Sequence, residues 1–207
     1  TRHIPECGAP TRPATGIRDA GLELRYVLAQ PWPAFTTYRG SGLSLVDLRR
    51  DVAWTEADLR AVLCHETYPG HHVQDLVWDE LRERRGWTEF AVLPPFTPHA
   101  LMAERAAVTA TALLWPPAEG PLVDRLLAEL APMAAATAVE IVDGKLDRRT
   151  GLARLADDLL MPNADEFVAF VEQARSMTLA YVTPASEVHD WESYLELLRS
   201  PERLVAG

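Results

Sequence analysis

The sequence has little cysteine and no surplus of basic charge. Its 207 residues include only two cysteines, Cys7 and Cys64. Two cysteines do not make a disulfide framework, so we expect a reducing compartment and predict a cytoplasmic protein. The 20 Lys and Arg residues are outnumbered by 30 Asp and Glu residues, which gives a net charge of −10. This balance argues against a nucleic-acid or anionic-membrane partner, because no excess of cations is available to neutralise phosphates.

Long apolar runs and targeting signals are also missing from the sequence. No run reaches the roughly 18 apolar residues that a membrane-spanning helix needs, and the N-terminus lacks the basic, apolar and small-residue pattern of a signal peptide. The sequence begins with Thr1 rather than Met, so we expect that it can be part of a longer chain. Its 48% hydrophobic and 24% charged residues are typical of a globular protein with a core. We therefore predict one domain over residues 1–207.

The first 50 residues indicate a small β element. Residues 1–20 contain several Pro and Gly residues, and we expect them to be irregular. Apolar and charged residues alternate over residues 22–28, which predicts a strand. The Pro- and Gly-containing residues 31–42 are expected to form a loop, and residues 43–48 a second short strand.

The remainder of the sequence has helical periodicity. Thr55 and Asp58 form a capping signal that predicts the start of the first long helix, and Gly86 follows its expected end. Five more helical patterns follow, and we expect them over residues 98–115, 121–142, 150–160, 163–179 and 190–200. The sequence therefore predicts a mostly α fold with a small β element before the first long helix.

That first helix contains the stretch LCHETYPGHHVQ, residues 63–74. A His-Glu-x-x-His helix presents two zinc ligands on one face and a Glu that acts as a base. Here the fourth residue after His65 is Pro69, and the other histidines are His71 and His72. On a regular helix His71 would lie about 240° round from His65, and His72 about 10 Å along the axis. Neither could share a metal ion with His65 in that geometry.

The Pro69-Gly70 pair can change this geometry by interrupting the helix between His65 and His71. Pro69 cannot donate a hydrogen bond to the carbonyl of His65, and its ring clashes with that carbonyl. Gly70 gives the backbone room to bulge. We interpret Pro-Gly as a two-residue bulge that brings His71 to the position of the second ligand, with His72 as the reserve candidate. Asp75, four residues after His71, can then support its imidazole ring.

A third ligand is expected from the apolar helix at residues 98–115. Glu104 is a lone acid among small and apolar residues, and a buried acid needs a partner that a metal ion would supply. His99 is a competing ligand in the same helix. Two other interpretations stay open, a surface patch of Glu104 and Arg105, and a solvated helix bearing the histidines. A Pro in such a surface helix would cost about 3 kcal/mol, which favours the metal site.

HETYPGHHVQ resembles the HExxPGHHxQ signature of a bacterial domain-of-unknown-function family that is placed among the gluzincin-type metallopeptidases. PWPAFTTYRGSG and TPHALMAERAA resemble the segments that flank this signature in the family. The resemblance implies a zincin-like helical fold that binds Zn²⁺ through His65, His71 and Glu104, with Glu66 as the base. Arg105 departs from the family pattern, which has Gly after the third ligand.

A gluzincin also needs a donor for the oxyanion and a surface that holds its substrate. We consider Tyr181 the first candidate donor, and Arg175, His189 and Tyr38 the others. By analogy with zincins, residues 43–48 would be an edge strand that pairs with an extended substrate.

We conclude that the sequence predicts a zinc-dependent hydrolase of a peptide or a small amide-containing substrate. Glu66 would take a proton from water and pass it to the leaving amine. One alternative is a metal-dependent lyase, cyclase or rearrangement enzyme that acts on a small metabolite. The other is a binding module with a degenerate site.

Overall fold

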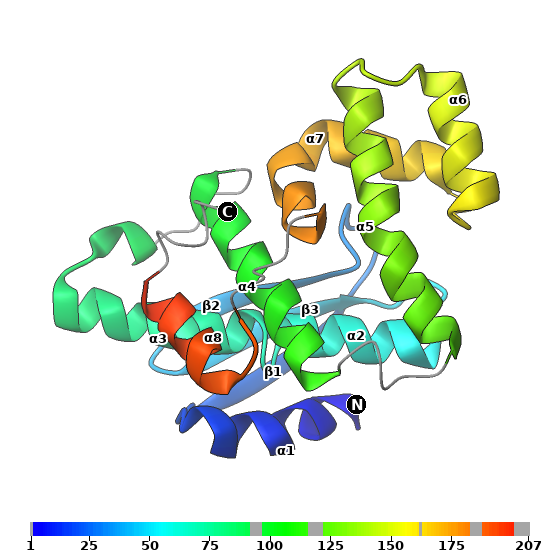
Figure 1. The fold of residues 1–207 in the computed structure, drawn as a ribbon. Coiled ribbons are helices and arrows are strands. Elements are labelled where there is room, and N and C mark those ends of the chain that lie inside the picture. Colours follow the sequence, from blue (N-terminus) through cyan, green and yellow to red (C-terminus); the bar gives the residue numbers. More distant parts are fainter. Residues whose placement is uncertain (1, 92–96, 116–121, 162, 183–187, 201–207) are drawn as a thin grey trace.

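The computed structural model describes residues 2–91, 97–115, 122–161, 163–182 and 188–200. Most of these residues are helical, and the strands form one small sheet near the N-terminus (Figure 1). The predicted fold class, mostly α with a small β element before the motif helix, is therefore confirmed. No helix in the described ranges combines the length and apolar character needed to cross a membrane.

The sheet contains β1 (Gly21–Val27), β2 (Ala34–Gly40) and β3 (Leu43–Arg49) in the order β1-β3-β2. β3 pairs in parallel with β1 and antiparallel with β2. The two strands predicted from periodicity are confirmed, but the expected loop over residues 31–42 is wrong. The Pro and Gly residues there flank a strand instead of interrupting it, and its aromatic and β-branched residues favour a sheet. The expectation that residues 43–48 form an edge strand is also wrong, because β3 is central and β2 lies at an edge.

The N-terminal segment forms α1 (His3–Thr15), although its prolines predicted irregular structure. Tertiary contacts explain the difference. Cys7 forms a disulfide with Cys64 of the motif helix, and the Arg12 guanidinium donates to the Tyr68 hydroxyl at 2.7 Å. These contacts hold the segment against the motif and offset its poor helix propensity. The two cysteines, which were not expected to form a disulfide framework, are joined in one disulfide bond.

The motif lies on two helices, α2 (Glu56–Glu66) and α3 (His71–Arg85). As predicted, the Thr55 side chain caps α2 by accepting from the Asp58 amide. Gly86 ends α3 with a φ of 69°, a left-handed conformation that glycine adopts without strain. An interruption at Pro69-Gly70 is found as predicted, but it is wider than the expected two-residue bulge, because neither helix includes residues 67–70.

The five helical patterns predicted after residue 97 are found, and they are preceded by a short 3₁₀ helix that was not predicted. Their bounds are η1 (Thr88–Ala91), α4 (Pro98–Leu114), α5 (Leu122–Val142), α6 (Arg148–Ala153), the π-helix η3 (Arg154–Asp158), α7 (Ala164–Val182) and α8 (Trp191–Arg199). Asp190 and Ser193 form a capping box at the start of α8. Helix α5 continues through Pro132, and the predicted start at Pro121 lies outside the described residues.

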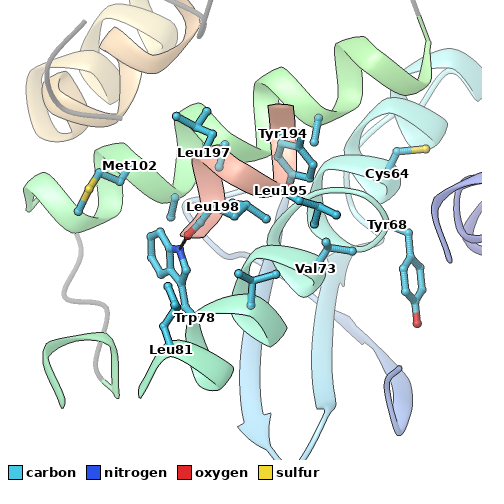
Figure 2. Close-up of a cluster of buried hydrophobic side chains, with 14 of the residues drawn as sticks. Cys64, Tyr68, Val73, Trp78, Leu81, Met102, Tyr194, Leu195, Leu197 and Leu198 are labelled. Atoms are coloured by element: carbon cyan, nitrogen blue, oxygen red, sulfur yellow. Dashed lines mark hydrogen bonds between the residues drawn. The ribbon is translucent and has the colours of Figure 1, made fainter. Parts of the chain in front are cut away.

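The main core lies where α3, α4 and α8 meet, and a second core lies among α5, α6, η3 and α7. Figure 2 shows residues of α8 packed over Val73 and Trp78 of α3. The Trp78 indole donates to the Leu198 carbonyl at 3.2 Å, which ties α8 to the motif helix. The second helix of the motif is therefore held from the C-terminal side of the chain.

The Cys7–Cys64 bond predicts that stability depends on oxidation. The bond closes a sequence separation of 57 residues, for which chain entropy gives a stabilisation of about 4 kcal/mol. We expect the free energy of unfolding, measured by denaturant titration, to be about 2–4 kcal/mol larger for the oxidised protein than for the reduced protein or for the Cys7→Ser/Cys64→Ser double variant. Two reactive thiols in the unfolded but unreduced protein would contradict the bond.

Candidate metal centre

The break between α2 and α3 brings the chain back onto the carbonyl of His65. The Thr67 amide donates to Leu63, and the Gly70 amide then reaches the Cys64 carbonyl at 3.2 Å. A Cβ atom on Gly70 would lie 1.7 Å from the His65 carbonyl oxygen. No side chain fits in that space, so only glycine allows the backbone to turn this tightly.

His65, His71 and Glu104 lie together across this break. The His65 Nε2 atom is 3.4 Å from one Glu104 oxygen, and the His71 Nε2 atom is 3.3 Å from the other. The candidate ligand atoms of the three residues all lie within 4.8 Å of one another. Ligands of a tetrahedral zinc ion, with bonds of about 2.0–2.2 Å, lie about 3.3–3.6 Å apart. Each imidazole lies at this distance from one of the two Glu104 oxygens, and the group could hold a metal ion.

The electrostatics of the cluster also fit a cation. Burial opposes the charged form of Glu104, but hydrogen bonds and charge from His65 and His71 outweigh burial and hold its pKa well below the usual range. Burial also opposes the charged form of His71, but Glu104 raises the pKa of this imidazole to about 10. The Glu104 carboxylate therefore stays ionised beside the imidazoles. A bound metal ion would supply a positive charge there and displace a proton.

The His71 ring is oriented by Gln74 on the next turn of α3. The His71 Nδ1 atom lies 3.2 Å from the Gln74 side-chain oxygen. Because that oxygen only accepts, Nδ1 must carry the proton, which leaves Nε2 for a metal ion. Gln74 in turn donates to Asp75 at 2.9 Å. Asp75 therefore supports the ligand through Gln74, and not directly as its spacing from His71 suggested.

Glu66, the expected base, is the last residue of α2 and is 7% exposed. The Thr36 hydroxyl lies 2.8 Å from its Oε2 atom and 2.7 Å from its carbonyl oxygen. Thr36 belongs to β2, the segment that was expected to be a loop, so its role could not be predicted from the sequence.

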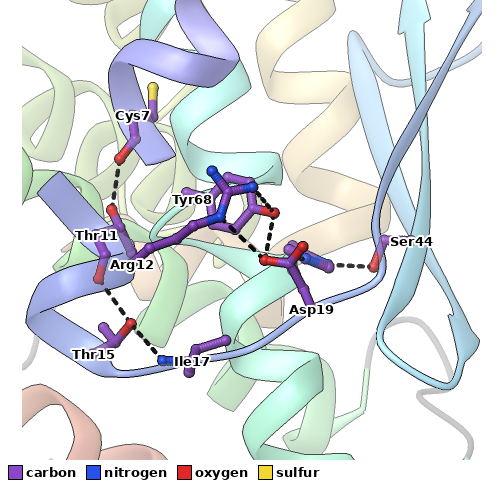
Figure 3. A network of polar contacts seen from close by, with 9 residues as sticks. Cys7, Thr11, Arg12, Thr15, Ile17, Asp19, Ser44 and Tyr68 are labelled. Carbon is purple, nitrogen blue, oxygen red and sulfur yellow. Dashed lines mark hydrogen bonds and ion pairs between the residues drawn. The ribbon is translucent and has the colours of Figure 1, made fainter. Parts of the chain in front are cut away.

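His72, the reserve ligand, lies apart from this cluster. Its Nδ1 atom is 2.7 Å from the Ser44 hydroxyl, and its ring contacts Tyr68 edge-on. Burial lowers the pKa of His72 to about 4, so the ring is neutral at pH 7. Figure 3 shows the surrounding polar network, in which the Tyr68 hydroxyl donates to Asp19 at 2.7 Å. His72 thus connects α3 to Ser44 of β3 and to Asp19 of the N-terminal segment.

The competing ligand assignments do not match the structure. The His99 ring packs against Phe90 with centroids 5.5 Å apart, and His99 is not part of the candidate metal group. Arg105 is 4% exposed, which contradicts a surface patch of Glu104 and Arg105. The Arg105 side chain is therefore buried within the protein and not part of its surface.

The expected oxyanion donors are not among the described contacts of the cluster. Tyr181 and Arg175 lie in α7, but their side chains are outside the described residues, so their roles stay predictions. His189 is exposed. The Tyr38 hydroxyl donates to Asp79 at 2.8 Å and accepts from the Gly42 amide at 2.9 Å, which is a structural role.

Tyr194 is a further residue that the sequence did not indicate. It is fully buried in α8, and its hydroxyl donates to the Pro69 carbonyl at 2.9 Å. A contact across 125 positions leaves no local signal in the sequence. The bulge is therefore held from both ends of the chain, by Tyr194 on one side and by the Arg12–Tyr68 contact on the other.

Comparison of the chain with protein-family models, curated proteins and solved structures gives no match. The resemblance to the HExxPGHHxQ family therefore stays a prediction. The geometry of the candidate metal group and its neighbours is what indicates a function.

Gly70→Ala is expected to disrupt the centre, because its methyl group would overlap the His65 carbonyl. Overpacking of this kind costs about 1–3 kcal/mol or more, and relief requires movement of a ligand. We expect a loss of bound metal by elemental analysis together with a loss of stability. Gly144→Ala is the control for backbone strain without overlap, since Gly144 has a φ of 69° but open space around it. Equal metal content in the two variants would contradict the close contact.

The two neighbouring histidines should behave differently on substitution. His71→Ala removes a candidate ligand, and we expect it to abolish stoichiometric metal binding with modest loss of stability. His72→Ala creates a cavity beside Ser44, and we expect lower stability with the metal stoichiometry retained. Elemental analysis measures the metal content of both variants, and thermal unfolding measures their stability. If only His72→Ala lost the metal, His72 and not His71 would be the second ligand.

Proposed function

We propose that this protein is a zinc-dependent hydrolase of peptide or amide bonds, with a gluzincin-like centre. The observation that carries the proposal is the arrangement of His65, His71 and Glu104, with Glu66 directly after the first ligand. Two imidazoles and one carboxylate suit zinc, and the three ligands found in the described part of the chain leave a fourth position for water. A structural zinc site would instead have four protein ligands.

A bound zinc ion would supply Lewis-acid activation of water and of the substrate carbonyl. Glu66 then acts as the general base, because its carboxylate can accept a proton from water and return it to the leaving amine nitrogen. Its burial keeps bulk water from competing for this proton. Gln74 keeps the His71 ring in the tautomer that frees Nε2.

The sheet offers a binding surface for an extended substrate. β2 is an edge strand, and its residue Thr36 contacts the proposed base. An extended peptide can add to such an edge through main-chain hydrogen bonds. This geometry favours β2, and not residues 43–48, as the strand that holds the substrate.

The disulfide bond also bears on the compartment in which the protein is found. Disulfides persist in oxidising environments and are rare in the cytoplasm. The Cys7–Cys64 bond therefore favours an oxidising compartment over the predicted cytoplasmic location.

Glu66→Gln tests the proposed reaction. The amide cannot accept the proton from water, so we expect turnover to fall by about 10²–10⁴-fold with zinc retained. Hydrolysis is measured on a mixture of peptides and N-acyl amides, and zinc by elemental analysis. Glu83→Gln on the exposed side of α3 is the matched control and should equal the wild type.

Two results would contradict the proposal. Equal turnover in Glu66→Gln and the wild type would remove Glu66 from the reaction. A zinc-loaded wild type that cleaves no peptide or amide would favour the lyase alternative, and a wild type that binds no zinc would favour a degenerate binding module.

A further inference from the structure

Strand β2 follows the motif across the break between α2 and α3. Alternate residues of a strand face the same side of its sheet, and Ala34, Thr36 and Tyr38 share the side that faces the helices. Ala34 packs with Leu63 of α2, Thr36 contacts Glu66 at the end of α2, and Tyr38 contacts Asp79 of α3.

The position of β2 is itself fixed. It pairs antiparallel with β3 from Ala34 opposite Leu48 to Tyr38 opposite Ser44. Ser44 in turn contacts His72 of α3. The sheet is thus attached to the motif at several points, and Thr36 reaches the proposed base from a rigid element.

The Thr36 hydroxyl contacts Glu66 in two places. It lies 2.7 Å from the carbonyl oxygen and 2.8 Å from Oε2 of the same residue. One hydroxyl proton shared between these atoms fixes the side chain relative to its own backbone. In the described part of the chain, the structure shows no hydrogen bond to the other carboxylate oxygen, Oε1.

The Thr36 contact restrains the Glu66 side chain at a position where helix α2 itself restrains it little. Glu66 is the last residue of α2, so no further helical turn packs around its side chain. A carboxylate that serves as a base must be held close to its productive geometry. A neutral hydroxyl can orient Oε2 without neutralising the charge, which a cationic partner would do.

We propose that Thr36 is a positioning residue for the base, holding Oε2 of Glu66 so that Oε1 is presented to the proton donor. This inference rests on the proposed function and adds to it a residue that lies outside the motif. Thr36 is not a metal ligand and is not expected to touch the reacting atoms.

Three variants separate positioning from a merely structural role. Thr36→Val keeps the shape but removes the hydroxyl, and Thr36→Ser restores a hydroxyl. Thr37→Val is the matched control, because Thr37 is opposite Leu45 and faces the other side of the sheet. Each variant is compared with the wild type for zinc content, turnover and binding of acetohydroxamate.

Acetohydroxamate is a useful probe because it chelates zinc while giving up a proton that a neighbouring carboxylate can accept. We expect Thr36→Val to bind zinc as the wild type does, to bind acetohydroxamate about tenfold more weakly, and to lose kcat with little change in KM. Thr36→Ser should recover the acetohydroxamate affinity and kcat of the wild type. Thr37→Val should leave both quantities unchanged.

The outcomes distinguish the two proposals. If the wild type binds zinc and acetohydroxamate but Thr36→Val equals it, the positioning role is wrong and the hydrolase proposal stands. If Thr36→Val loses zinc as well, or Thr36→Ser fails to rescue it, the contact is structural and the positioning role is also wrong. A wild type that binds neither zinc nor acetohydroxamate overturns both proposals.

Discussion

The close contact between Gly70 and the carbonyl of His65 is the constraint on which the candidate metal centre depends. A regular helix would separate His65 from His71 by rotation, and the pair could not face one ion. The break after Glu66 removes this obstacle, because the chain turns back onto the carbonyl that Pro69 cannot bond. Both rings then face Glu104 from α4, at 3.4 and 3.3 Å. Pro69 interrupts the helix, and this interruption allows His65, His71 and Glu104 to lie together.

The rest of the molecule holds this irregular segment in place. Tyr194 of α8 donates to the Pro69 carbonyl, while the Cys7–Cys64 bond attaches α1 to the residue before His65. Burying such a turn without partners would leave backbone carbonyls unpaired, which is costly. Elements from both ends of the chain therefore converge on a few residues, and strand β2 adds a contact to Glu66. This convergence explains why the break between α2 and α3, which contains the Pro69-Gly70 pair, can be buried in the core.

The sequence predicted the parts of this arrangement that leave a local signal. Helices with clear periodicity and caps, such as those starting after Thr55 and Asp190, were found where expected. Glu104 was identified because a lone acid in an apolar helix needs a partner. Helix α1 was missed because its prolines disfavour a helix that tertiary contacts stabilise. Strand β2 was missed because flanking Pro and Gly residues suggested a loop, and with it the role of Thr36.

Long-range pairing accounts for the remaining differences. Strand order, the Cys7–Cys64 bond and the Tyr194 contact join residues that are far apart in the chain, and no periodicity encodes such pairs.

The central claim, that His65, His71 and Glu104 bind one zinc ion, is tested most directly by zinc K-edge X-ray absorption on the purified protein. We expect two imidazole nitrogens and carboxylate or water oxygens at about 2.0–2.2 Å in a four-coordinate shell. A protein without stoichiometric zinc, or a zinc shell that contains sulfur or no imidazole, would contradict it.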